Sequence, residues 1–189
     1  AKHGITVDIV ITDDTIIPNT SLQEGSIDAN FFQHQPYLDQ FNLENGTDLV
    51  SIGATHYEPF AVYSDNLESL SELPNGAKIA VPNNVSNEAR ALLLLEQEGV
   101  IKLNENAGIT ATVTDIKENP KNISIIEIDP QQLVNVLPDV NAAVINGNYA
   151  LAGGLSIKDS IAQEKSDGIA AQTYKNIVVT TSAKAKDPN

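Results

Sequence analysis

Arg90 is the only arginine in this chain of 189 residues, and its position predicts an anion-binding role. The residues around it read as the end of a strand followed by a helix that Ser86 or Asn87 can cap and that Gly99 can end. Arg90 would then lie in the first helical turn, where the helix dipole disfavours a cation by roughly 0.3–1 kcal/mol. Free amide groups at a helix N-terminus together with a guanidinium form a receptor for a carboxylate. A ligand could supply that carboxylate, or the protein could, through Glu88 or an aspartate of another lobe.

A group of aromatic side chains has residue types that suit an apolar ligand group. Phe32, His34 and Tyr37 lie where we expect a short strand to pass into a helix that starts near Pro36. Aromatic rings at such a point can enclose an apolar side chain, and a thioether sulfur is a favourable partner for them. These three residues could instead fill the core. For Phe31, which should face away from Phe32, core filling is the prediction.

Asn146 is the third candidate, because it follows directly after an apolar stretch that predicts a buried strand. An asparagine side chain offers both a donor and an acceptor, which suits the ammonium or the carboxylate of an amino acid. In an Asn-Gly pair the side chain often stabilises its own turn instead, and both interpretations stay open.

The composition and the missing motifs exclude several classes of function. The 11 basic and 25 acidic residues give a formal net charge of −14, so the chain offers no basic footprint for nucleic acid. The absence of cysteine excludes disulfides, thiol catalysis and cysteine-ligated metal centres. The phosphate-binding, dinucleotide-binding and nucleophile-elbow motifs are missing, and the histidines lack metal-ligand spacing. We therefore expect no enzyme, no metal and no cofactor.

The elements that must position these residues alternate between strands and short helices, which predicts an α/β fold with open parallel sheets. The almost wholly apolar stretches 79–81 and 142–145 suit parallel strands that are covered on both faces. The expected strands are 6–12, 48–55, 60–63, 78–81, 123–128, 142–145 and 176–180. The expected helices are 19–23, 35–42, 67–73, 87–98, 130–137 and 148–152.

Two polar segments suggest that the chain forms two lobes and crosses between them twice. The expected division places lobe I at 1–66, a crossing at 67–76, lobe II at 77–160, a second crossing at 161–173, and the return to lobe I at 174–189. Two α/β lobes joined by two crossings can close on a small ligand and bury it between them.

Several stretches of the chain, in this order, resemble the NlpA-type lipoproteins, which are methionine-binding substrate receptors of bacterial ABC importers. The matching stretches include Gly25-Ser26-Ile27-Asp28-Ala29-Asn30, Phe32-Gln33-His34-Gln35-Pro36-Tyr37-Leu38, Val81-Pro82-Asn83-Asn84, Asn87 with Arg90, Glu118-Asn119-Pro120-Lys121-Asn122 and Ala143-Val144-Ile145-Asn146. Together they span nearly the whole chain.

The resemblance implies a two-lobed periplasmic-binding-protein fold of the type II kind, with two open sheets and a hinge. It implies that Arg90, assisted by Asn87, holds the carboxylate of the ligand and that Asn146 binds its polar end. Side-chain pocket residues would then be Phe32, His34 and Tyr37. The implied ligand is L-methionine or a close relative, such as D-methionine or a methionine dipeptide. The implied setting is a monomer anchored by a lipid outside the cytoplasmic membrane, where it docks on a permease that has a cytoplasmic ATPase.

Two departures from the family pattern stand out. Thr15 replaces a tyrosine that walls the pocket in many members, so the ligand preference could differ. Residues 1–4 resemble the end of the family's first helix, and residues 187–189 precede its terminal helix. We therefore expect the biological protein to be longer than 189 residues at both ends, with a lipidated cysteine upstream.

Two further functions remain as alternatives. A surface lipoprotein with an adhesive role and vestigial ligand binding would fit the high acidity. A small-molecule transferase on the same two-lobed frame lacks a nucleophile or an acid–base pair.

Overall fold

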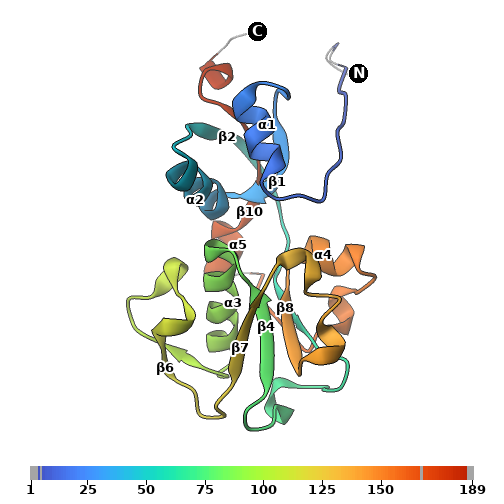
Figure 1. The fold of residues 1–189 in the computed structure, drawn as a ribbon, viewed down its shortest axis with the longest axis vertical. Coiled ribbons are helices and arrows are strands. Elements are labelled where there is room, and N and C mark those ends of the chain that lie inside the picture. Colours follow the sequence, from blue (N-terminus) through green and yellow to red (C-terminus); the bar gives the residue numbers. More distant parts are fainter. Residues whose placement is uncertain (1–3, 5, 167, 187–189) are drawn as a thin grey trace.

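The first lobe is built on a three-stranded sheet that two helices cover (Figure 1). The computed structural model describes residues 4, 6–166 and 168–186. The sheet has the order β1 (Asn30–His34), β10 (Lys175–Thr181), β2 (Leu49–Tyr57), and β10 is antiparallel to both neighbours. Helices α1 (Ile17–Glu24) and α2 (Gln35–Asn45) pack on it. Their shared core consists of Leu22, Leu38, Phe41, Leu49, Ile177 and Val179.

The second lobe contains a five-stranded sheet of mixed direction. Its order is β7 (Ser124–Ile128), β4 (Lys78–Pro82), β8 (Ala142–Ile145), β3 (Ala61–Tyr63) and β9 (Ala162–Gln163). Strand β4 runs parallel to β7 and β8, whereas β3 is antiparallel to β8 and β9. The prediction of parallel strands therefore holds for β7, β4 and β8 of this sheet and not for the sheet of the first lobe.

Both faces of the second sheet are covered, as the apolar strands indicated. Ile79 and Val81 pack in one core with α3 (Val85–Gln97), whereas Ala80 packs in a second core on the other face with α4 (Gly147–Ala152). Alternate residues of a strand point to opposite faces, so a strand buried on both sides must be apolar throughout.

The remaining elements are short. Strands β5 (Lys102–Leu103) and β6 (Ile116–Glu118) form a two-stranded sheet beside α3, and helix α5 (Ile169–Thr173) precedes β10. Single 3₁₀ turns lie at Leu70–Glu72, Gly108–Thr110, Val113–Asp115, Pro130–Gln132, Leu137–Asp139, Ile157–Asp159 and Lys184–Lys186.

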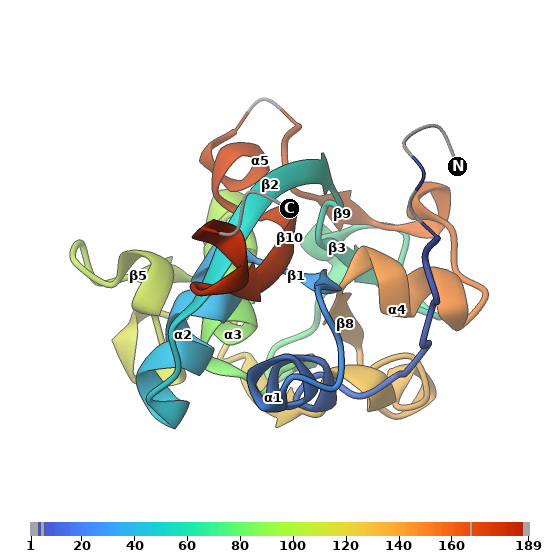
Figure 2. The same ribbon diagram turned by 90° about the horizontal axis from the view of Figure 1, so that it is seen from above.

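Three expected elements are wrong or shortened. Residues 6–12 form no strand, and Val7, Ile9, Val10 and Ile11 are exposed, because this segment meets no described strand that could complete a ladder. Figures 1 and 2 show it running along the outside of the molecule, apart from the first sheet. The helices expected at 67–73 and 130–137 are reduced to 3₁₀ turns. In the second of these segments Val134 and Val136 disfavour a helix, and Pro138 directly after it prevents the helix from continuing.

The sheets divide the chain at other residues than we expected. Residues 60–63 were placed in lobe I, but β3 is hydrogen-bonded to β8 and β9 in the second sheet. The chain therefore passes to the second lobe directly after β2, at 58–60, and returns between β9 and β10. The expectations for residues 1–3 and 187–189 lie outside the described part of the chain. No helix among the described residues has the length and apolar character needed to cross a membrane.

Candidate functional site

A cavity of about 250 Å³ lies between the two lobes. Residues from β1 and the start of α2 line one side, and residues from α3 and the end of β8 line the other. All six residues that the sequence singled out line it, namely Phe32, His34, Tyr37, Asn87, Arg90 and Asn146. The structure thus brings together side chains that lie up to 114 positions apart, from Phe32 to Asn146.

Helix α3 carries two of these residues, and its first turn differs from the expectation. The N-cap is Asn84, whose side chain accepts a hydrogen bond from the Asn87 N–H at 3.1 Å, so the cap is neither Ser86 nor Asn87. Arg90 is consequently the sixth residue of Val85–Gln97 and lies in the second turn. There the penalty from the helix dipole is weaker than in the first turn.

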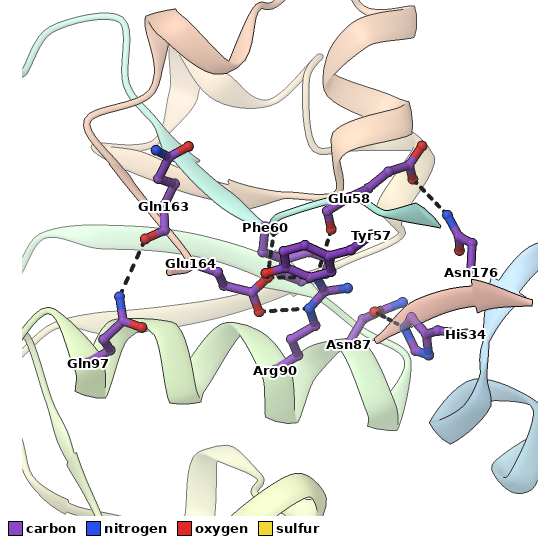
Figure 3. A network of polar contacts seen from close by, with 10 residues as sticks. All are labelled: His34, Tyr57, Glu58, Phe60, Asn87, Arg90, Gln97, Gln163, Glu164 and Asn176. Atoms are coloured by element: carbon purple, nitrogen blue, oxygen red, sulfur yellow. Dashed lines mark hydrogen bonds and ion pairs between the residues drawn. The ribbon is translucent and has the colours of Figure 1, made fainter. Parts of the chain in front are cut away.

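The partner of Arg90 within the protein is Glu164, which the sequence did not indicate. Arg90 Nε donates to Glu164 Oε1 at 2.8 Å, and Nη2 donates to Glu164 Oε2 at 2.6 Å and to the Glu58 carbonyl oxygen at 2.8 Å (Figure 3). Both side chains are buried, at 3% and 4% exposure. Glu88, the partner we considered, instead accepts the Val113 N–H at 3.1 Å. No local pattern in the polar segment around Glu164 links it to a helix 74 positions earlier.

Aromatic rings enclose the Arg90 guanidinium. Its central carbon lies 4.1 Å from the centroid of the Phe60 ring, 4.4 Å from that of Tyr174 and 5.6 Å from that of Tyr57. Stacking of this kind stabilises a desolvated cation. Nη1 is the guanidinium nitrogen without a hydrogen bond to any described residue.

His34 connects the first lobe to α3. Its Nδ1 accepts the Tyr37 N–H at 3.2 Å, so the ring proton is on Nε2, which donates to Asn87 Oδ1 at 3.0 Å. Burial lowers the pKa of His34 to about 4, and the nearby Arg90 charge lowers it further in the same direction. The ring is therefore neutral at pH 7, and it leaves the Asn87 amide NH₂ group available to the cavity.

The other aromatic residues divide between the cavity and the outer surface. The Phe32 and Tyr37 rings meet edge to face with centroids 5.8 Å apart, and the Tyr37 hydroxyl donates to the Thr15 carbonyl oxygen at 2.8 Å. Phe31 does face away from Phe32, but the expectation that it fills the core is wrong. It is 51% exposed and packs against His56, because the outer face of the first sheet is uncovered there.

Two buried polar atoms at the cavity have no partner among the described residues, namely Asn146 Oδ1 and the Tyr174 hydroxyl. Asn146 precedes α4 and makes no side-chain cap to it, so the local turn role that we considered is not observed. An unsatisfied buried acceptor costs about 1–3 kcal/mol, which a ligand donor can recover. Like Glu164, Tyr174 was missed, although its position directly before the returning strand is a weak signal for it.

Comparison with known proteins identifies the family. The family model for the NlpA lipoproteins, which describes their shared sequence pattern, matches residues 1–189. The chain is a member of the NlpA lipoprotein family. It is 44% identical over 182 residues to the D-methionine-binding lipoprotein MetQ of Escherichia coli, an alignment that covers 95% of this chain and 66% of that relative. The chain thus spans about two thirds of the length of this NlpA-family relative.

Two solved structures place the fold among substrate-binding proteins. A nutrient-binding protein from Burkholderia cenocepacia bound to methionine superposes with a TM-score of 0.94 at 48% identity, covering 99% of this chain and 78% of that one. A periplasmic substrate-binding protein of an ABC transporter from Coxiella burnetii gives a TM-score of 0.93 at 43% identity, covering 99% and 77%. The α/β, two-lobed binding-protein fold expected for an NlpA-type protein is confirmed.

Proposed function

We propose that this protein binds methionine, or a close relative of it, between its lobes and delivers it to an ABC importer without catalysing a reaction. The observation that carries the proposal is the composition of the cavity. A fixed guanidinium, an unpaired amide oxygen and a group of aromatic rings meet in one space between two lobes. Those are the partners that the carboxylate, the ammonium and the apolar side chain of an amino acid require.

Each end of the ligand has its own partners in this proposal. The carboxylate binds Arg90 Nη1 and the free amide NH₂ group of Asn87. The ammonium donates to Asn146 Oδ1, whose missing partner among the described residues supports that role. The thioether packs against Phe32 and Tyr37 beside the neutral His34 ring.

The size of the cavity favours one amino acid over a dipeptide. Ligand pockets commonly measure roughly 300–1,000 Å³, and this cavity, at about 250 Å³, is below that range. A single amino acid therefore fills it better than a methionine dipeptide does.

The setting follows from what the relatives are called. We propose a monomer that is anchored by a lipid outside the cytoplasmic membrane and docks on a permease; the names of the Escherichia coli lipoprotein and the Coxiella burnetii periplasmic protein support the anchor and the transport setting. We also propose that the connections at 58–60 and between β9 and β10 act as the hinge of lobe closure, since they join the two sheets. Closure would bury the ligand and present a defined surface to the permease.

Calorimetric titration tests this function. The purified protein is titrated with each of the twenty amino acids, D-methionine and Gly-Met. We expect a methionine enantiomer to bind more tightly than the other ligands. Absence of heat from all of these ligands, or tighter binding of an unrelated amino acid, would contradict the proposal.

A further inference from the structure

Glu164 lies at the centre of the polar network beside the cavity, but it does not line the cavity itself (Figure 3). It is 5% exposed and accepts four hydrogen bonds from three residues. Two come from Arg90, one from the Tyr57 hydroxyl at 2.6 Å, and one from the Phe60 N–H at 2.8 Å. A carboxylate with so many donors is held in one orientation.

The same contacts fix the guanidinium of Arg90. Glu164 holds Nε and Nη2, and the Glu58 carbonyl oxygen accepts a second bond from Nη2. The donors left for a ligand are those of Nη1. When a long arginine side chain is already immobile, ligand binding does not have to order it, so less of the binding free energy is lost.

We propose that Glu164 is a positioning residue, which orients Arg90 so that Nη1 is presented to the carboxylate of the ligand. This inference rests on the proposed function, because it assigns a task to a side chain that the ligand does not touch. The alternative is a purely structural carboxylate that joins the two connections between the lobes. The two roles differ in what happens to Arg90 when the carboxylate is lost.

Glu164→Gln keeps the shape of the side chain and removes its charge, which makes it the first test. We expect its dissociation constant for L-methionine to rise at least about tenfold, the effect of losing roughly 1.4 kcal/mol of binding free energy. Arg90 offers an independent signal, since it is the only arginine in the chain. In an amide NMR spectrum its Nε–H group gives one side-chain peak, which is assigned by its loss in Arg90→Lys.

The position of that peak separates positioning from a structural role. In the ligand-free wild type we expect the Nε–H peak to be shifted from its solvent-exposed position and slow to exchange with water. In folded Glu164→Gln the Arg90 Nε–H peak should move toward the chemical shift of a solvent-exposed arginine, and its proton should exchange with water faster. A weakened affinity with an unchanged peak overturns the inference, and so does an unchanged or tighter affinity.

Glu88→Gln is the matched control, because Glu88 is also 5% exposed but lies outside the cavity lining. It should leave both the affinity and the Arg90 peak as in the wild type. If Glu164→Gln does not fold, Tyr57→Phe keeps the ion pair and removes one bond to Oε2. For Tyr57→Phe we then expect the Arg90 peak to shift in the same direction and the affinity for L-methionine to fall about two- to tenfold. An unchanged peak or an unchanged affinity overturns the inference.

The outcome for the wild type keeps the two proposals apart. Failure of the wild-type protein to bind methionine contradicts the proposed function. Normal wild-type binding together with an unaffected Glu164→Gln variant contradicts only the positioning role.

Discussion

Nε2 of His34 in the first lobe lies 3.0 Å from Oδ1 of Asn87 in the second lobe. The bond has Nε2 as its donor in a neutral ring, because Nδ1 accepts the Tyr37 N–H and therefore carries no proton. It thereby links the lobes and also orients the amide that faces the cavity.

The free energy of unfolding should decrease at low pH, because the buried His34 resists protonation in the folded protein. Burial lowers its pKa to about 4 from the ordinary value of 6.5, so below pH 6.5 the unfolded chain binds a proton that the folded protein does not. The free energy of unfolding should therefore fall as the pH drops from about 6.5 to 4, by up to about 3 kcal/mol. Urea unfolding at a series of pH values measures this. The slope should be shallower in His34→Gln, and equal slopes in both proteins would contradict the assignment.

Arg90→Ala should weaken both binding and folding. Loss of a charge-assisted bond to the carboxylate predicts a decrease in L-methionine affinity of roughly 10- to 150-fold. The same change leaves Glu164 buried without its ion-pair partner, so the free energy of unfolding should fall by about 3–5 kcal/mol. Calorimetry and urea unfolding measure the two effects. The double variant Arg90→Ala/Glu164→Ala should recover part of the stability but none of the affinity.

Asn146→Ala should separate function from stability. Its Oδ1 is buried and has no partner among the described residues, so removal of the amide should change the free energy of unfolding by no more than about 1 kcal/mol. Methionine affinity should fall roughly tenfold or more, because the ammonium loses its acceptor. Wild-type affinity in a well-folded Asn146→Ala protein would exclude the amide from the site.

Two adjacent phenylalanines provide a matched pair for the apolar pocket. Phe32 lines the cavity, whereas Phe31 is half-exposed on the other face of β1. We expect Phe32→Ala to reduce the affinity for methionine more than the affinity for alanine, which has no thioether to pack. Phe31→Ala should leave both affinities unchanged. A larger effect at Phe31 would place the side-chain pocket elsewhere.

Local patterns in the sequence were sufficient to predict the elements that carry the site. Residues 79–81 of β4 and strand β8 are apolar because both faces are buried, and α3 has a run of leucines, although its cap is Asn84 and not the expected Ser86 or Asn87. These features depend on neighbours in sequence, so they can be read without knowledge of the fold. Five of the six candidate residues were found because their types are rare in the chain or because they follow directly after a predicted strand, whereas Asn87 was indicated by the family resemblance.

The parts that the sequence did not reveal depend on contacts between distant segments. The bond between Arg90 and Glu164 spans 74 positions, and neither residue's neighbours indicate the other. Strand β3 was assigned to the wrong lobe for the same reason, since a short apolar strand does not encode which sheet it joins. Residues 6–12 have a strand-like composition but need a hydrogen-bonding partner that the described residues do not supply.

A crystal structure of the protein grown with L-methionine tests the central claim most directly. We expect the ligand carboxylate within hydrogen-bonding distance of Arg90 Nη1, the ammonium at Asn146 Oδ1 and the thioether between Phe32 and Tyr37. An empty cavity at saturating methionine, or a ligand whose carboxylate lies away from Arg90, would contradict the account.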